Sequence, residues 1–280
     1  MGKLTVLPFG ESEYSELQRQ VGAVIDKART CDKPWFEANK QQYFDAKTRT
    51  DRPAGELINA IQARHSVRKY TDRPIEAEKA ATLRAEMERL NGASGLNIQL
   101  VLDEPRAFAS GLWKYGQFAC VKNYFVMAGP KGKEAEEKIG YFGEHLVLLS
   151  QTLGLNTCWV GLTYKKIPGT FTLREGDIVH CVIALGYGAN AGVQHPLKPM
   201  ERFYDCGGTP PQWFLSGMEA ALLAPTAVNQ QKFKFFLKDG NQVEARSFFS
   251  MAGYTSIDLG IVKCHFEIGA GKDNFDWVRN

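Results

Sequence analysis

One long amphipathic segment, residues 134–155, constrains the fold more than any other feature of this sequence. Its large apolar residues recur at intervals of three and four, which places them along one face of an α-helix. These residues are Ile139, Phe142, Leu146, Leu149 and Leu153. Gly154 follows and suits the left-handed conformation that often ends a helix. We therefore predict a core helix over Glu134–Leu155, followed at once by an apolar, strand-like segment that reaches Leu162.

Shorter segments on both sides of this helix alternate between the helical period and the strand period. The predicted helices are Glu56–Arg64, Glu76–Leu90, Gln212–Leu223 and Ile257–Ile268, the second ending at Asn91-Gly92. The predicted strands are Asn97–Asp103, Asn123–Ala128, Val179–Leu185 and Lys232–Lys238. Another amphipathic helix is predicted over Ser12–Arg29, within an N-terminal arm that either packs on the body or is a flexible lead-in.

The composition excludes several classes of protein. Hydrophobic residues make up 44% and charged residues 23% of the 280 residues, which is typical of a soluble globular chain with a sizeable core. The 34 basic and 31 acidic residues give a net charge of +3, too small to indicate a nucleic-acid or membrane-surface partner. The sequence has neither an apolar run long enough for a membrane span nor an N-terminal signal peptide. We therefore expect a cytoplasmic protein.

The cysteines and histidines do not predict a metal site or a disulfide framework. None of the six cysteines forms a C-x-x-C pair, and most lie in apolar surroundings, which is typical of reduced core thiols. The five histidines have no metal-ligand spacing with cysteines or carboxylates, so no metal is expected.

A weak internal repeat relates the two ends of the chain. With a shift of 132 residues (215 − 83 = 132), Leu83, Leu90 and Asn97 fall on Leu215, Leu222 and Asn229. With a shift of 113 (254 − 141 = 113), Tyr141, Leu146 and Leu149 fall on Tyr254, Leu259 and Val262. Either the chain holds two degenerate copies of a helix–loop–strand–helix unit, or these matches arise by chance.

The segment Arg64-His65-Ser66-Val67-Arg68 follows the first predicted helix of the body. Arginine presents a planar fork of donors that matches phosphate and stays charged in any pocket. The Ser66 hydroxyl adds a short donor for a phosphate or ribityl oxygen. The alternative is a solvated basic turn.

A second candidate is the loop Leu223–Gln231, in which a helix ends at a turn fixed by Pro225. Its small residues, Ala224, Thr226 and Ala227, would let a flat ring approach the backbone. Asn229 and the two glutamines after it can both donate and accept hydrogen bonds, which suits the edge of a heterocycle. The alternative is an ordinary loop between a helix and a strand.

Two further segments contain glycines. Gly161 interrupts the strand-like segment after the core helix, where it either exposes a backbone N–H to a ligand or marks a bulge. Gly186–Gly192 resembles a dinucleotide fingerprint, but Pro196 and Pro199 bar the helix that such a site needs at its pyrophosphate. The sequence has no nucleophile elbow and no triad that stands out, so we expect a bound cofactor to supply the chemistry.

Taken together, these segments resemble the FMN-dependent nitroreductase family over roughly residues 55–270. Arg64–Arg68 is similar to the family's basic motif, and Pro225–Asn229 to its proline–small–small–x–Asn loop. Leu153–Gly161 is similar to its helix-ending motif, and Ala184–Tyr187 to the turn after a strand. The resemblance implies an α+β, nitroreductase-like fold with a mixed, mainly antiparallel sheet flanked by helices.

The chain departs from the family in one respect. Members carry the proline loop some thirty residues after the basic segment, whereas here the intact copy lies far downstream (225 − 66 = 159) and the nearby copy, Ala93–Gln99, lacks the proline. Because members are homodimers with flavin sites at the interface, the resemblance implies a fused internal duplication, a pseudo-dimer in one chain. We expect an arm (1–53), one half (54–205), a shorter half (206–280), one flavin per chain and a monomer.

The resemblance also implies the residues that bind FMN. Arg64, His65 and Ser66 would hold the phosphate and ribityl chain, and Arg68 would stabilise the negative charge of reduced flavin. Val160, Gly161 and Leu162 would bring backbone N–H groups to flavin N5. Lys198 and Arg202 would form a basic pair for the phosphate. The second half would supply Pro225, Thr226, Ala227 and Asn229.

The implied function is a ping-pong reduction in which NADH or NADPH delivers hydride to the flavin and a small organic acceptor then takes the electrons. No side chain is expected to act as acid or base. The alternatives are a non-catalytic flavin-binding protein, a flavin-fragmenting or reductive-dehalogenating relative, and a structural protein that has lost the cofactor.

Overall fold

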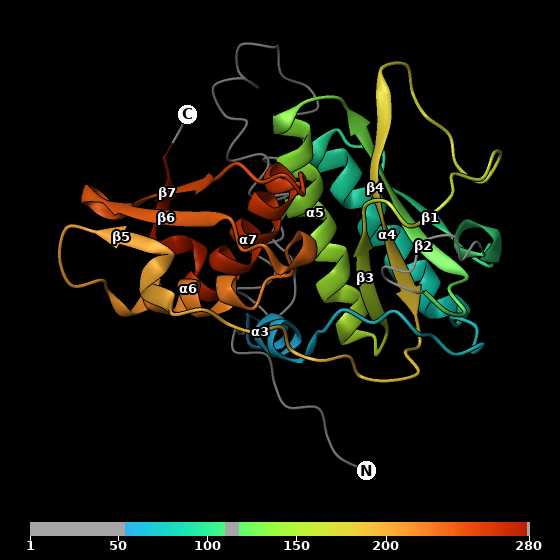
Figure 1. Ribbon diagram of the computed structural model, residues 1–280, viewed down its shortest axis with the longest axis horizontal. Coiled ribbons are helices and arrows are strands. Elements are labelled where there is room, and N and C mark those ends of the chain that lie inside the picture. The colour runs from blue at the N-terminus through green and yellow to red at the C-terminus, as the bar shows by residue number, and fades with distance from the viewer. Residues whose placement is uncertain (1–53, 110–117, 279–280) are drawn as a thin grey trace, which may run out of the picture.

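The computed structural model describes residues 54–109 and 118–278 (Figure 1). The predicted arm, with its helix Ser12–Arg29, lies outside the described residues. The helices are α3 (Ala54–Ala63), α4 (Ala77–Ser94), α5 (Lys133–Thr152), α6 (Gln212–Leu222) and α7 (Thr255–Ala270). The strands are β1 (Gln99–Val101), β2 (Asn123–Pro130), β3 (Asn156–Val160), β4 (Asp177–Gly186), β5 (Tyr204–Cys206), β6 (Phe233–Lys238), β7 (Gln242–Ser247) and β8 (Asp276–Trp277).

The strands form two sheets rather than the single sheet that we expected. The first has the order β1-β2-β4-β3, and all its neighbours are antiparallel. The second has the order β5-β6-β7-β8, in which β6 and β7 are antiparallel and the two edge pairs are parallel. In Figure 1 the two sheets lie on opposite sides of α5 and α7, so these helices form the centre of the molecule.

Burial on both faces explains why β4 is a continuous apolar run. Successive side chains of a strand point to opposite faces, and here each face meets a separate core. Cys181, Ile183 and Leu185 join the cluster that contains α5 and α7, whereas Val182 and Ala184 join the cluster on the outer side. The prediction of a strand over Val179–Leu185 is confirmed, and all of its residues except the partly exposed His180 are buried.

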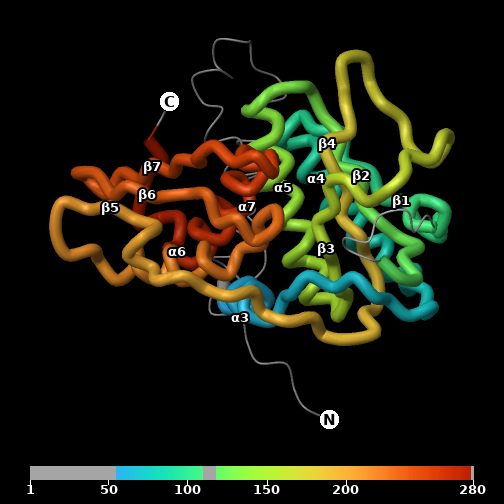
Figure 2. Tube along the Cα trace, in the orientation of Figure 1, coloured from blue at the N-terminus to red at the C-terminus, as the bar shows by residue number. Residues whose placement is uncertain are grey.

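The central contact of the fold is the crossing of α5 and α7, which lie side by side in Figures 1 and 2. The backbones approach so closely that a Cβ on Gly140 would lie 2.0 Å from the carbonyl oxygen of Ile257. In turn, a Cβ on Gly260 would lie 1.9 Å from the carbonyl oxygen of Glu137. The contact is therefore reciprocal and relates the helices by 120 residues (260 − 140 = 120; 257 − 137 = 120).

This relation differs from the shift of 113 predicted for the same pair of helices. The difference of seven residues equals two helical turns, and an apolar face repeats its pattern over that distance. Hydrophobic spacing alone therefore could not select the correct register. The two glycines distinguish a shift of 120 from one of 113, because they are the positions at which the two helix backbones meet.

Two other sequence predictions need correction. The helix α4 does not end at Asn91-Gly92 but continues to Ser94, where Gly95 takes a φ of +75° and donates its backbone N–H to Asn91 O. The strands β5, β7 and β8 were not predicted. The strands β5 and β8 have only three and two residues, too few for an apolar pattern to be recognised, and β7 buries only Val243 and Ala245 in an otherwise polar sequence.

The crossing generates a stability prediction. Gly140→Ala or Gly260→Ala should lower the free energy of unfolding by about 3 kcal/mol or more, since the new methyl group meets backbone atoms that no rotamer change can move. Gly55→Ala is the matched control, because this exposed glycine in α3 has open space around its Cβ position. Chemical denaturation measures all three. Equal stabilities for Gly140→Ala and Gly55→Ala would contradict the close crossing.

Candidate active site

The basic segment lies in an extended conformation beside β3. The Val67 N–H donates to Thr157 O at 3.0 Å, and Ser66 forms a bridge with Thr157. Burial raises the pKa of the neighbouring Cys158 thiol, while the Arg68 charge and the Ser66 hydroxyl oppose that rise. Ser66 and Arg68 are therefore both close to β3, and the Arg68 side chain is exposed.

Arg64 connects the basic segment to the downstream proline loop. Its Nη1 donates to Leu223 O at 3.0 Å, two residues before Pro225. The side chain is only 5% exposed, and burial lowers the pKa of its guanidinium, against the opposing effect of the nearby Glu144 carboxylate. Segments that are 159 residues apart in sequence thus meet here, as the resemblance implied.

The glycine-rich segment after β4 covers the basic segment. Ala189 N–H donates to Lys69 O, and Thr71 N–H to Tyr187 O, both at 2.8 Å. A Cβ on Gly192 would lie 2.8 Å from the Cβ of His65, so the two backbones are in close contact. In Figure 2 these segments run side by side below α3 and β3. The absence of a helix directly after Gly186–Gly192 agrees with our rejection of a dinucleotide fingerprint.

The proline loop has a strained backbone. Val228, Asn229 and Gln231 have φ values of +47°, +53° and +48°, a conformation that is rare for residues other than glycine and unfavourable for a β-branched one. The Val228 side chain is 84% exposed, so packing does not compensate the strain there. Other contacts must hold the loop in this shape.

Asp258, in the first turn of α7, supplies these contacts. Its Oδ1 accepts the backbone N–H of Ala227 at 2.9 Å, and its Oδ2 accepts the side-chain amide of Gln230 at 2.6 Å. The carboxyl group is buried, and burial raises its pKa to about 6, although both hydrogen bonds act in the opposite direction. Thr226 adds a third contact, since its Oγ1 accepts the N–H of Gln231 at 3.1 Å.

The proline loop and the similar loop Ala93–Gln99 each contain an asparagine and a glutamine whose side-chain amides bond to each other, but the remaining hydrogen bonds of the two pairs differ. Gln231 Nε2 donates to Pro196 O and to Asn229 Oδ1, and Gln99 Nε2 donates to Thr172 O at 2.6 Å and to Asn97 Oδ1 at 3.3 Å. The difference is in the acceptor oxygens. Gln99 Oε1 accepts the Thr172 N–H at 2.9 Å, whereas the buried Oε1 atoms of Gln230 and Gln231 have no hydrogen-bond partner among the residues that the structure describes.

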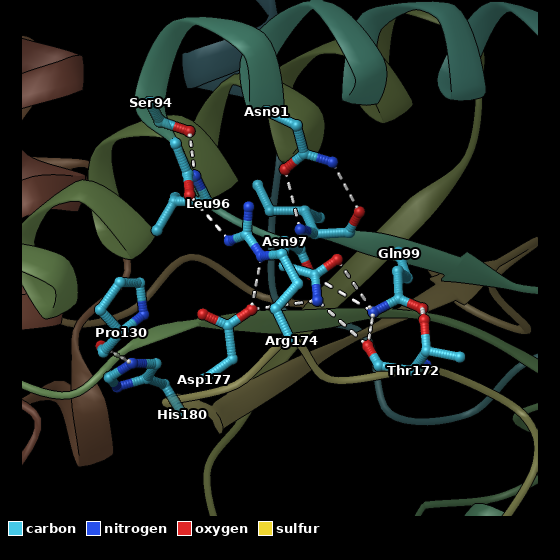
Figure 3. Close-up of polar contacts among 12 residues, drawn as sticks. Asn91, Ser94, Leu96, Asn97, Gln99, Pro130, Thr172, Arg174, Asp177 and His180 are labelled. Carbon is cyan, nitrogen blue, oxygen red and sulfur yellow. Dashed lines mark hydrogen bonds and ion pairs between the residues drawn. The ribbon is translucent and has the colours of Figure 1, made fainter.

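Further contacts close the first-half loop. The Asn97 amide donates to Asp177 Oδ2, and Arg174 donates to the same carboxylate and to Gly95 O (Figure 3). The segment Thr172–Asp177 of the same chain therefore forms hydrogen bonds with the polar groups of Ala93–Gln99. No comparable segment satisfies the loop that follows α6 among the described residues.

The end of β3 lies against the start of α7. A Cβ on Gly161 would be 2.5 Å from the hydroxyl oxygen of Tyr254, so this ring covers the glycine. Tyr254 itself has a φ of +62°. Val160 is buried, whereas Leu162 is exposed. These contacts bring the predicted N–H donors close to the helix that anchors the proline loop.

The two predicted basic residues after β4 are placed differently. Lys198 Nζ lies 3.5 Å from Gln230 O, beside the proline loop, and Asn229 Nδ2 lies 3.4 Å from the nearby Pro196 O. Arg202 is exposed in the turn Met200–Arg202.

Several residues of this region were not predicted from the sequence. Asp258 lies in the first turn of α7, which the sequence predicts only as an apolar helix, and Tyr254 directly precedes that helix. Their partners lie about 30 and 90 residues away in the chain (258 − 227 = 31; 254 − 161 = 93). His195 is a third example, because its Nε2 lies 2.9 Å from Leu222 O. The proline–small–small–x–Asn motif predicted the loop itself, but not these partners.

Comparison with known proteins agrees with this geometry. The family model described as "Putative TM nitroreductase" matches residues 56–270. The chain belongs to this nitroreductase family. A solved structure of a putative nitroreductase from Thermotoga maritima has 20% sequence identity and a TM-score of 0.53, and the match covers 81% of this chain and 89% of that one. The nitroreductase fold predicted from the motifs is therefore confirmed.

Other solved nitroreductases match at lower TM-scores. An FMN-dependent nitroreductase from Clostridium difficile is 18% identical, with a TM-score of 0.37 and coverage of 48% of this chain and 88% of that one. A nitroreductase with bound FMN from Bacteroides fragilis is 19% identical, with a TM-score of 0.39 and coverage of 51% and 94%. No curated protein matches the nitroreductase chain.

Two other expectations can be compared with the described residues. Cys158, Cys181 and Cys264 are buried thiols, as predicted, but Cys120 is exposed and Cys206 partly so, while Cys31 lies outside the described residues. Across residues 54–109 and 118–278, no helix has the length and apolarity that crossing a bilayer requires.

The buried Asp258 carboxyl predicts a pH dependence. Because its pKa is about 6 in the folded state and about 3.9 when unfolded, the folded chain binds more protons between these values, and stability falls as the pH rises through them. Asp258→Asn should remove this slope. Because wild type loses stability over this range and the variant does not, the free energy of unfolding of Asp258→Asn minus that of wild type should increase by about 2 kcal/mol between pH 4 and pH 7. Urea denaturation across this range measures it, with exposed Asp239→Asn as control. Parallel curves for Asp258→Asn and wild type would contradict the assignment.

Proposed function

We propose that this nitroreductase is an FMN-dependent oxidoreductase that uses NADH or NADPH to reduce a small organic acceptor. Family membership supports oxidoreductase chemistry, and two of the similar structures are described as FMN-dependent or as holding FMN. The observation that carries the proposal concerns the strained proline loop, in which the buried acceptor oxygens of Gln230 and Gln231 have no hydrogen-bond partner within residues 54–109 and 118–278.

These oxygens fit the chemistry of FMN. A buried acceptor without a donor costs about 1–3 kcal/mol, so a native site that retains two of them is suited to a ligand that brings donors. FMN carries such donors in its ribityl hydroxyls and in the N3–H of its ring. The equivalent oxygen of Gln99 already accepts a donor from the chain itself, which favours the downstream loop as the ligand site.

The proposed ligands divide between the two halves of the chain. Arg64, His65, Ser66 and Arg68 come from the first half, together with the backbone N–H groups of Val160, Gly161 and Leu162. The second half supplies Pro225, Thr226, Ala227 and Asn229. Lys198 and Arg202 complete the set as phosphate partners, and the contact of Lys198 with the loop supports it more than Arg202.

Each group has a defined task in this proposal. When bound, FMN supplies the two-electron chemistry that accepts hydride from a nicotinamide and passes it to an acceptor. The exposed Arg68 guanidinium provides positive charge where negative charge accumulates on reduction. The buried Arg64 holds the two halves together through Leu223 O, and Asp258 keeps the proline loop in its strained shape. The chain thus supplies position and electrostatics.

We also infer that the chain is a fused pair of similar halves with a single FMN site. The reciprocal crossing of α5 and α7 supports an internal duplication, and the two amide pairs at Asn97 and Asn229 support a common origin of the loops. The chain's own Thr172–Asp177 segment fills the first-half loop. We therefore infer one FMN per chain and a protein that needs no partner subunit to complete its site.

The activity is tested by the visible spectrum of the purified protein. After reconstitution with FMN, the yellow absorbance should bleach on addition of NADH or NADPH under anaerobic conditions and return when an acceptor such as a quinone or a nitroaromatic compound is added. If neither nicotinamide bleaches the flavin band, the protein binds flavin but is not a nicotinamide-dependent enzyme. A protein that takes up no FMN would contradict the whole proposal.

Arg68→Ala tests the electrostatic role. Loss of the positive charge should lower the reduction potential of bound FMN by roughly 20–60 mV, equivalent to about 1–3 kcal/mol, and should weaken the binding of oxidised FMN less than this. Arg84→Ala, on the exposed face of α4, is the matched control. Redox titration and FMN affinity are measured together. Equal losses of binding free energy for oxidised and reduced FMN would show that Arg68 only anchors the cofactor.

A further inference from the structure

A buried acid–imidazole pair lies where α5, α6 and α7 meet. Glu144 and His265 are both 0% exposed, and His265 Nε2 lies 2.8 Å from Glu144 Oε1. The other ring nitrogen, Nδ1, lies 3.0 Å from Ala220 O in α6. Both ring nitrogens therefore face oxygen atoms.

These contacts fix the number of protons. A carbonyl oxygen can only accept, so His265 Nδ1 must carry a proton. The short contact between Nε2 and Oε1 needs one more proton, held either by the imidazole or by the carboxyl group. In both cases the pair holds one proton more than a neutral imidazole and a carboxylate would hold together. An imidazolium beside a carboxylate is one such form, and in it every hydrogen bond is satisfied.

The second carboxylate oxygen holds the strand that leads to the candidate site. Trp159 Nε1 donates to Glu144 Oε2 at 2.9 Å. The indole also packs on α5, since a Cβ on Gly143 would lie 2.5 Å from its Cη2 atom. Trp159 is in β3, directly before Val160 and Gly161. Its ring is therefore fixed by a hydrogen bond and by close packing, and the backbone that follows is fixed with it.

This arrangement exists on one side of the crossing only. The relation of 120 residues places His145 opposite His265 (145 + 120 = 265) and Glu144 opposite Cys264 (144 + 120 = 264). Both ring nitrogens of His145 lack a hydrogen-bond partner among the described residues. The complete set of contacts thus lies on the side that carries Trp159 and Gly161, and the nearby Glu144 charge also acts on Arg64.

We propose that Glu144, His265 and Trp159 form a proton-sharing positioning network that sets the Val160–Gly161 backbone for the flavin. The three residues are positioning residues, because they act on the site through β3. This inference rests on the proposed function, since it requires FMN to bind at Gly161. It assigns a role to groups that lie in the middle of α5 and α7, away from the predicted ligands.

The first test uses the apoprotein and needs no cofactor. The indole N–H resonance of Trp159, assigned by its loss in Trp159→Phe, should lie downfield as expected for a donor to a carboxylate. Glu144→Gln keeps every hydrogen bond, because its amide can donate to a neutral His265 and accept from the indole, but it removes the charge. The resonance should therefore move upfield in Glu144→Gln. An unchanged resonance would show that the indole does not donate to Glu144.

The second test measures FMN affinity. Trp159→Phe keeps the acid–imidazole pair but removes the donor, and it should weaken FMN binding about tenfold, as expected for a lost bond to a charged group. Glu144→Gln, which keeps the hydrogen bond to the indole, should by itself retain most of the wild-type affinity for FMN. Trp213→Phe is the matched control, since this indole stacks on Phe275 in another part of the fold, and it should bind FMN like wild type.

The outcomes separate the two proposals. A wild-type protein that binds no FMN would overturn the proposed function and, with it, the positioning role. A wild-type protein that binds FMN, with Trp159→Phe equal to Trp213→Phe, would overturn only the positioning role. Tighter FMN binding by Trp159→Phe than by Glu144→Gln would show that the charge of the carboxylate, rather than the hydrogen bond to β3, is what matters, and would also overturn the positioning role.

Discussion

The close crossing of α5 and α7 is the contact on which the rest of the structure depends. Gly140 and Gly260 let the two backbones touch, and no side chain larger than hydrogen fits at either position. This approach brings His265 to Glu144, Tyr254 to Gly161 and the α7 N-terminal turn to the first half. Residues separated by more than a hundred positions therefore share one region because two helices can meet without side chains between them.

The two loops that follow α4 and α6 are similar but not equivalent. Both loops after the helices α4 and α6 contain an asparagine and a glutamine two residues apart that bond to each other and to a carbonyl oxygen. In the first half, the chain itself supplies the remaining donor through Thr172. In the loop after α6, two buried acceptor oxygens find no partner in the described part of the chain, and the backbone is strained. A protein retains such costs where a ligand or a function compensates them.

Much of the fold could be predicted from the sequence, because strong local patterns correspond to local structure. The period of α5, the apolar run of β4 and the stop at Gly154 are properties of neighbouring residues. The basic segment and the proline loop were also found by motif, and Arg64 and Leu223 are in contact. By contrast, the polar strand β7 and the short β8 depend on partners in the sheet rather than on their own pattern.

The tertiary roles could not be predicted. Asp258 and His265 are single polar residues in an apolar helix, and their meaning depends on partners 28 to 121 residues away. The burial of Arg64 is likewise a property of the assembled halves rather than of its motif. The register of the repeat was ambiguous by two helical turns until the backbone contact of Gly140 and Gly260 fixed it.

The central claim is that two unlike halves of one chain enclose a single flavin. Titration of the apoprotein with FMN, followed by the quenching of flavin fluorescence and by the protein concentration from amino-acid analysis, tests it most directly. The account predicts saturation at one FMN per chain. Saturation at two FMN per chain, or no saturable binding at all, would contradict it.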